Sequence, residues 1–100
     1  PTLIFDEVDT GIGGITADKV GDMLSALATE QQVLCITHLA QIASKGHRHF
    51  KISKHIDKAS THSDVMQLHK QDRINEIARM LGGTSKTSQA HAKSLLKESH

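Results

Sequence analysis

Two short apolar runs without polar alternation constrain the fold of this chain more than any other feature. Leu3-Ile4-Phe5 leads into an acidic stretch, and Val33-Leu34-Cys35-Ile36 follows about 30 residues later. Strands that are apolar on both faces are typical of parallel sheets covered on both sides. Between the runs, a three- and four-residue apolar period predicts a helix from Thr16, with Thr16 as N-cap and Asp18 in the first turn. Together these segments predict a βαβ unit with parallel strands.

The rest of the chain predicts a hairpin flanked by helices. A short helix is expected from about Leu39 to Lys45, ended by a left-handed Gly46. A two-residue period over 50–56 predicts a half-exposed strand, and a turn near 57–60 followed by a weaker strand at Asp64–Leu68 completes a hairpin.

Two helices are expected after the hairpin. Asp72 is predicted to cap a helix that Gly82-Gly83 ends, and residues 86–97 form a second, weaker helical pattern. The apolar positions of the first of these helices fall on one face: Ile74, Ile77, Ala78 and Leu81.

Composition narrows the class of protein. A chain of 100 residues fits one domain, and it shows neither a long apolar span nor a secretory signal pattern. The single Cys35 suits a reducing compartment, and two phenylalanines argue against an aromatic platform for stacking bases. Residues 1–46 carry a net charge of −4 and residues 47–100 one of +5, but the basic residues are scattered. Charge alone therefore does not predict nucleic-acid binding.

The candidate site lies where the two apolar runs end. Asp6, Glu7 and Asp9 follow the first run, and His38 closes the second. Because parallel strands share a carboxyl edge, these side chains are expected to face one ligand crevice. One carboxylate can hold Mg²⁺, a neighbour can position or deprotonate a water, and the imidazole can donate to a phosphate oxygen.

Other potential sites are not supported by the sequence. The remaining histidines have no recognised ligand spacing, so a metal site built from them is not predicted: His47, His49, His55, His62 and His69. The phosphate-binding pattern G-x-x-x-x-G-K-[ST] does not occur, and the Gly11–Gly14 loop follows three acids that would repel phosphate. The chain thus carries the acidic half of a nucleotide site without the basic half.

These motifs resemble the ATPase heads of the ABC type, and in particular the bacterial DNA repair branch related to the structural-maintenance-of-chromosomes (SMC) proteins. Ile4–Ile12 resembles a Walker B strand with its D-loop, Cys35–Leu39 a switch-histidine segment, and Glu76–Gly83 narrows the likeness to the repair branch. The resemblance covers essentially the whole chain. Gly13 and Ala40 depart from it, standing where serine and proline are expected.

The resemblance implies an α/β fold: a partial P-loop NTPase (ABC-type) head, with a βαβ parallel sheet core followed by a hairpin and C-terminal helices. Residues 1–100 would form the C-terminal segment of one head. Asp6 would hold Mg²⁺ through a water, and Glu7 would be the catalytic base. Asp9 would make a D-loop contact across the interface between heads, and His38 would sense the γ-phosphate.

The function implied is that of a DNA double-strand-break repair ATPase, with ATP and Mg²⁺ as cofactors. Its partners would be DNA, the rest of its own head and a second head in a homodimer; no membrane is involved, and the location would be cytoplasmic and nucleoid-associated. The phosphate loop, coiled coil and signature motif are expected to lie outside this chain, so the chain alone is expected to be inactive.

Two alternatives from other classes remain open. A stand-alone receiver-like phosphotransfer domain could use Asp6 as phosphoacceptor. Such a domain requires a lysine after a later parallel strand, where this chain has His38. A small basic DNA-binding module could be built on residues 47–100, and the salt dependence of its affinity would identify it.

Overall fold

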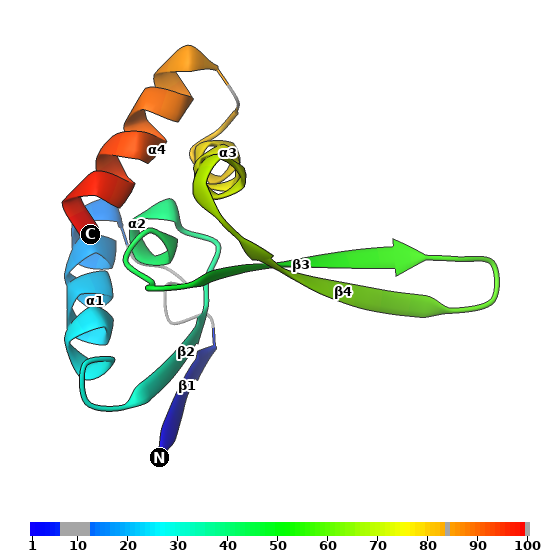
Figure 1. The fold of residues 1–100 in the computed structure, drawn as a ribbon, viewed down its shortest axis with the longest axis horizontal. Helices are drawn as coiled ribbons and strands as arrows, with labels where there is room; N and C mark the ends of the chain where they lie inside the picture. Colours follow the sequence, from blue (N-terminus) through cyan, green and yellow to red (C-terminus); the bar gives the residue numbers. More distant parts are fainter. Residues whose placement is uncertain (7–12, 84, 100) are drawn as a thin grey trace.

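A parallel pair of strands, joined by a helix, opens the fold (Figure 1). The structure is a computed structural model that describes residues 1–6, 13–83 and 85–99. Strand β1 (Thr2–Asp6) pairs with β2 (Gln32–Ile36), and helix α1 (Gly14–Leu27) connects them. The register runs from Thr2 opposite Gln32 to Asp6 opposite Ile36. The predicted parallel βαβ unit is therefore confirmed.

The two strands are not covered on both faces. Leu3 and Phe5 are half-buried, whereas Ile4, on the opposite face of β1, is 69% exposed. In β2, Leu34 and Ile36 are likewise exposed to about half of their surface. The prediction of burial on both faces is wrong for the described chain, because no second layer of described residues covers this side of the pair.

Helix α1 begins earlier than the sequence suggested. Gly13 is its N-cap and accepts the first helical bond, from Ala17 N at 2.9 Å. Thr16 therefore lies inside the helix, and Asp18 lies beyond the first turn, so both N-terminal predictions are wrong. Ala17 is fully buried, as its place in the apolar period predicted.

Helix α2 (Ala40–Ala43) follows β2 after a three-residue connection. Its C-cap is Ser44, which has right-handed helical φ and ψ angles. The next two backbone N–H groups donate to the carbonyl three residues earlier, Lys45 N to Ile42 O and Gly46 N to Ala43 O. Gly46 does not adopt a positive φ, so its predicted left-handed role is wrong. The chain leaves α2 through a tightening turn, and a left-handed residue is not needed there.

The hairpin projects from the body as a two-stranded ribbon (Figure 1). Strand β3 (His49–Ile56) pairs antiparallel with β4 (Thr61–Leu68), and the turn between them is closed by Asp57 N donating to Ser60 O. The predicted hairpin is confirmed, but β4 starts three residues earlier than expected. The added residues, 61–63, are polar on both faces, so apolar alternation could not reveal them.

Helices α3 (Lys70–Met80) and α4 (Lys86–Ser99) form the core with α2. The N-cap of α3 is His69, so the capping role predicted for Asp72 is wrong; Asp72 lies in the first turn, where its charge suits the helix dipole. The buried cluster that these helices share consists of Ala40, Ile77, Ala78 and Ala92. The apolar face predicted for α3 is confirmed.

Helix α3 ends as predicted at its two glycines. Gly82 has φ 119°, its N–H donates to Arg79 O, and the N–H of Gly83 reaches back to Ala78 O at 3.2 Å. These two bonds define a Schellman motif, which needs a left-handed residue at the position of Gly82. Within residues 1–6, 13–83 and 85–99, no helix combines the length and apolar character needed to cross a membrane.

Candidate functional site

The carboxyl ends of β1 and β2 bring two of the predicted site residues to one edge. Asp6 ends β1 opposite Ile36, the last residue of β2, and His38 stands two residues beyond Ile36. Both Asp6 and His38 are exposed to solvent. Glu7 and Asp9 lie outside the described residues. The edge thus presents a carboxylate and an imidazole from adjacent strands.

Local contacts shape the connection that carries His38. The N–H of Leu39 donates to the Thr37 hydroxyl oxygen at 3.0 Å, which closes a small turn around His38. Helix α2 starts at the next residue, Ala40, which is buried against α3. The backbone of His38 is therefore held by β2 on one side and α2 on the other.

Arg73 of α3 binds the far end of α2. Its Nη2 donates to three backbone oxygens, those of Ala43 at 3.2 Å, Ser44 at 3.4 Å and Gly46 at 2.6 Å. Burial lowers the pKa of Arg73. Burial also lowers the pKa of the neighbouring His49, and the positive charge of Arg73 adds to that effect. The sequence did not reveal this contact, since about 30 residues separate the donor from its acceptors.

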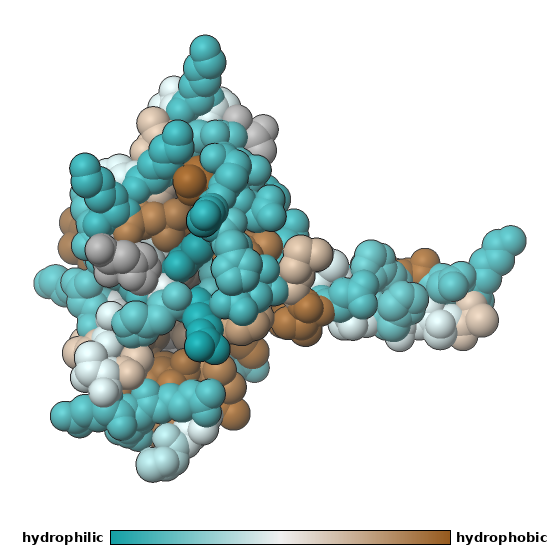
Figure 2. Space-filling model, viewed as in Figure 1, coloured by the Kyte–Doolittle hydropathy of each residue, from teal (hydrophilic) through white to brown (hydrophobic). Residues whose placement is uncertain are grey.

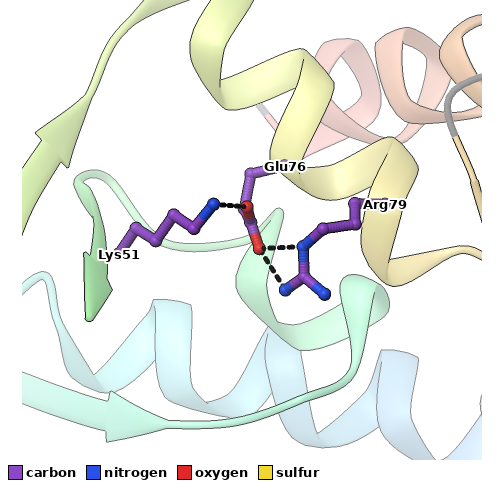
Figure 3. A network of polar contacts seen from close by, with 3 residues as sticks. All are labelled: Lys51, Glu76 and Arg79. Atoms are coloured by element: carbon purple, nitrogen blue, oxygen red, sulfur yellow. Dashed lines mark hydrogen bonds and ion pairs between the residues drawn. The ribbon is translucent and has the colours of Figure 1, made fainter. Parts of the chain in front are cut away.

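A second polar network ties the hairpin to α3 (Figure 3). Glu76, 7% exposed, accepts from Lys51 Nζ at 3.1 Å and from Arg79 Nε at 2.9 Å, and Arg79 Nη2 contacts the same carboxylate. Burial would raise the pKa of Glu76, but the hydrogen bonds and charges of Arg79 and Lys51 outweigh it and lower the pKa. The three-residue spacing of Glu76 and Arg79 could have signalled their pairing; nothing local signalled Lys51.

An open groove of about 1360 Å³ lies between the parallel strands and the base of the hairpin. Its apolar wall includes Ile4, Leu34 and Ile36, and its polar wall includes His38 and Lys51. Figure 2 shows apolar surface over the part of the body that holds β1 and β2, whereas the hairpin surface is mostly polar. A smaller hollow at the amino ends of the strands touches neither Asp6 nor His38.

The described residues supply some of the ligands that a nucleotide-bound Mg²⁺ would need. Among them, no group of three or more His, Cys, Asp or Glu side chains could hold a metal by itself. A single exposed carboxylate, Asp6, suits an ion that keeps several waters and takes its other ligands from phosphate oxygens. His38, two residues beyond the end of β2, offers a hydrogen-bond donor for such a phosphate.

Comparison with solved structures identifies the fold. The chain superposes with a TM-score of 0.65 on a structure from work on ATP-driven dimerization and DNA-stimulated activation of SMC ATPases, at 16% sequence identity. The match covers 85% of this chain and 50% of that one. The chain therefore has the α/β fold of an SMC-type ATPase head, and the fold class expected from the sequence is confirmed.

Comparison with curated proteins points to one member of that class. The chain is 54% identical over 92 residues to DNA repair protein RecN of Xylella fastidiosa, a match covering 92% of this chain and 16% of that protein. It is 50% identical over 97 residues to RecN of Deinococcus radiodurans and 40% over 99 residues to RecN of Bacillus subtilis, covering 96% and 97% of this chain. No protein-family model matches.

Over this stretch the chain is similar in sequence to DNA repair protein RecN. It spans about 16–17% of the length of the curated relatives that it matches. The resemblance drawn from the motifs at Ile4–Ile12, Cys35–Leu39 and Glu76–Gly83 is thereby confirmed.

Proposed function

We propose that residues 1–100 form the C-terminal segment of an ATPase head in a RecN-type DNA repair protein. The observation that carries the proposal is that Asp6 and His38 lie at one carboxyl edge of a parallel pair, in a chain with the SMC head fold and 54% identity to a RecN. Carboxyl edges of parallel strands are where ligands bind in open α/β folds.

Each site residue has a chemical task in this proposal. Asp6 holds Mg²⁺ through a water, and the ion, when bound, offsets the negative charge of the phosphates. Glu7 orients the attacking water and accepts its proton. His38 donates a hydrogen bond to a γ-phosphate oxygen, where negative charge must be stabilised as the bond to the leaving group breaks. Asp9 contacts the second head.

In the intact protein, two heads would close on ATP, and hydrolysis would be coupled to rearrangement on DNA. The ATP-driven dimerization and DNA-stimulated activation studied for the similar SMC ATPases support this part of the proposal. The partners are then DNA, the remainder of the same head and a second copy of it, in the cytoplasm at the nucleoid. Residues outside this chain would supply the phosphate-binding loop.

Three substitutions in the intact protein test these roles. Glu7→Gln keeps the shape but removes the base, so hydrolysis should fall by about 10²–10⁴ while ATP still binds. Asp6→Asn should weaken Mg²⁺-dependent ATP binding as well as turnover, because it alters the metal's surroundings. His38→Ala should slow hydrolysis and leave binding nearly unchanged.

Single-turnover kinetics and equilibrium ATP binding separate these outcomes. Lys93→Gln, a change of an exposed residue on α4, serves as the control and should leave both quantities at the parent level. Near-normal turnover by Glu7→Gln would remove Glu7 from the role of base. Unchanged ATP affinity in Asp6→Asn would remove Asp6 from the metal site.

A further inference from the structure

We propose that Arg73 is a positioning residue for ATP hydrolysis, because it fixes α2 and through α2 sets the place of His38 at the sheet edge. The inference rests on the proposed function, since it takes His38 to be the residue that contacts the γ-phosphate. It assigns a role to a residue that lies on another helix, far along the chain from the site motifs.

The first step is the contact between α3 and the end of α2. A single nitrogen of Arg73, Nη2, lies 2.6 Å from the oxygen of Gly46 and within 3.4 Å of those of Ala43 and Ser44. Carbonyls at the end of a helix lack partners within it and need donors from elsewhere. A charged donor makes stronger hydrogen bonds than a neutral one. Arg73 therefore binds three carbonyl oxygens at the end of α2 through one nitrogen atom.

The second step is that this contact is partly shielded from water. Arg73 is half-buried, and its Nε is buried without a hydrogen-bond partner among the described residues. The Nη2 contacts therefore hold the guanidinium in place. Ser44, whose oxygen is one of the acceptors, is fully buried. A shielded contact of this kind resists exchange with water, so it fixes a geometry more firmly than a surface contact would.

The third step leads from α2 to His38. Helix α2 has four residues, so it is about 6 Å long. Ala40, its first residue, belongs to the same buried cluster as Ile77 and Ala78 of α3. A helix of one turn, pinned at its start by packing and at its end by Arg73, moves as a unit. Leu39 alone separates it from His38, so a displacement of α2 displaces the imidazole.

The test uses Arg73→Gln and Arg73→Lys in the intact protein, with Lys93→Gln as a control that removes an exposed charge from α4. Arg73→Gln should lower kcat for ATP hydrolysis roughly tenfold, since small misplacements of catalytic groups cost large factors in rate. The KM for ATP should change by less than about threefold. Arg73→Lys, which keeps a charged donor, should recover part of kcat, and the control should match the parent.

A double-mutant cycle with His38→Ala separates positioning from general support of the fold. If Arg73 acts through His38, Arg73→Gln costs little further rate once the imidazole is gone. An equal loss of kcat in both backgrounds would overturn the inference while leaving the proposed function intact. If His38→Ala alone keeps full kcat, the role of His38 fails, and the inference fails with it. Should Arg73→Gln not fold, the same cycle with Arg73→Lys decides.

Discussion

Replacing Glu76 by Gln should destabilise the fold in a way that depends on pH. The carboxylate is 7% exposed and accepts from Lys51 at 3.1 Å and Arg79 at 2.9 Å (Figure 3). Glutamine keeps the shape and one acceptor oxygen, but it removes the charge that both cations face. The substitution therefore isolates the charged part of the network that joins the hairpin to α3.

The exposure of the two cations sets the size of the effect. Breaking a fully buried ion pair costs about 3–5 kcal/mol, and an exposed pair is worth about 0–1 kcal/mol. Here the acid is buried, but Lys51 and Arg79 are 43% and 62% exposed and can regain water. We expect an intermediate loss of about 1–2 kcal/mol at neutral pH. For a domain of this size, that corresponds to a Tm lower by roughly 5–15 °C.

The pH dependence follows from the direction of the shift. The pKa of Glu76 is lower in the folded state than its ordinary value of 4.5. A lowered pKa contributes stability above the unfolded-state value, and that stability is lost as pH falls through the folded-state pKa. The difference in unfolding free energy between the parent and Glu76→Gln should have its full size at pH 6–7, because Glu76 is then ionised in both the folded and the unfolded state. It should close as the pH is lowered below 4.5.

Urea denaturation of both proteins over this pH range is the assay, at a concentration low enough to avoid association. Glu98→Gln on α4, where the acid is exposed, is the matched control and should show no such gap. Equal stability of parent and Glu76→Gln at pH 7 would refute the reasoning. So would a gap that persists unchanged in acid.

Three further predictions follow from the fold. Gly82→Ala should lower the free energy of unfolding, measured in urea, by about 1–2 kcal/mol, because φ is 119° at this residue. Gly83→Ala, which has open space around it, should be nearly neutral, and equal costs of the two substitutions would contradict the Schellman motif. The 100-residue chain alone should show no tight, stoichiometric binding of Mg-ATP by calorimetry, since its sequence contains no G-x-x-x-x-G-K-[ST] pattern. The exposed apolar faces of β1 and β2 should make the chain self-associate, and Ile4→Lys, at a position on β1 that is 69% exposed, should reduce that association in light scattering; a parent that stays monomeric at high concentration would count against this.

The elements of the fold were predictable because their signals are local. The apolar runs at Leu3–Phe5 and Val33–Ile36 predicted the parallel pair, and the apolar face around Ile77 predicted the packing of α3. The ends of helices were less predictable. Thr16 and Asp72 have the chemistry of N-caps, but where the chain enters a helix depends on the preceding loop, and the caps are Gly13 and His69.

The site could be predicted only as far as chain topology fixes it. Topology alone brings Asp6 and His38 to one edge, whatever the remaining side chains are. The contacts of Arg73 with α2 and of Lys51 with Glu76 join residues about 25–30 positions apart, so no sequence period encodes them. The exposure of Ile4 on one face of β1 was also not predictable. An apolar run indicates that a strand is suited to burial, but it does not show that other residues of the chain cover it.

The parallel pairing of β1 with β2 also has a consequence for the order of folding. Thr2 and Gln32 lie 30 positions apart, and closing so long a loop loses more chain entropy than pairing Ile56 with Thr61 at the tip of the hairpin. Contacts between distant segments generally form late along a folding pathway. The hairpin and the α3–α4 pair can assemble first, and the edge that joins Asp6 to His38 is completed last. Weakening β1 should then speed unfolding more than it slows folding.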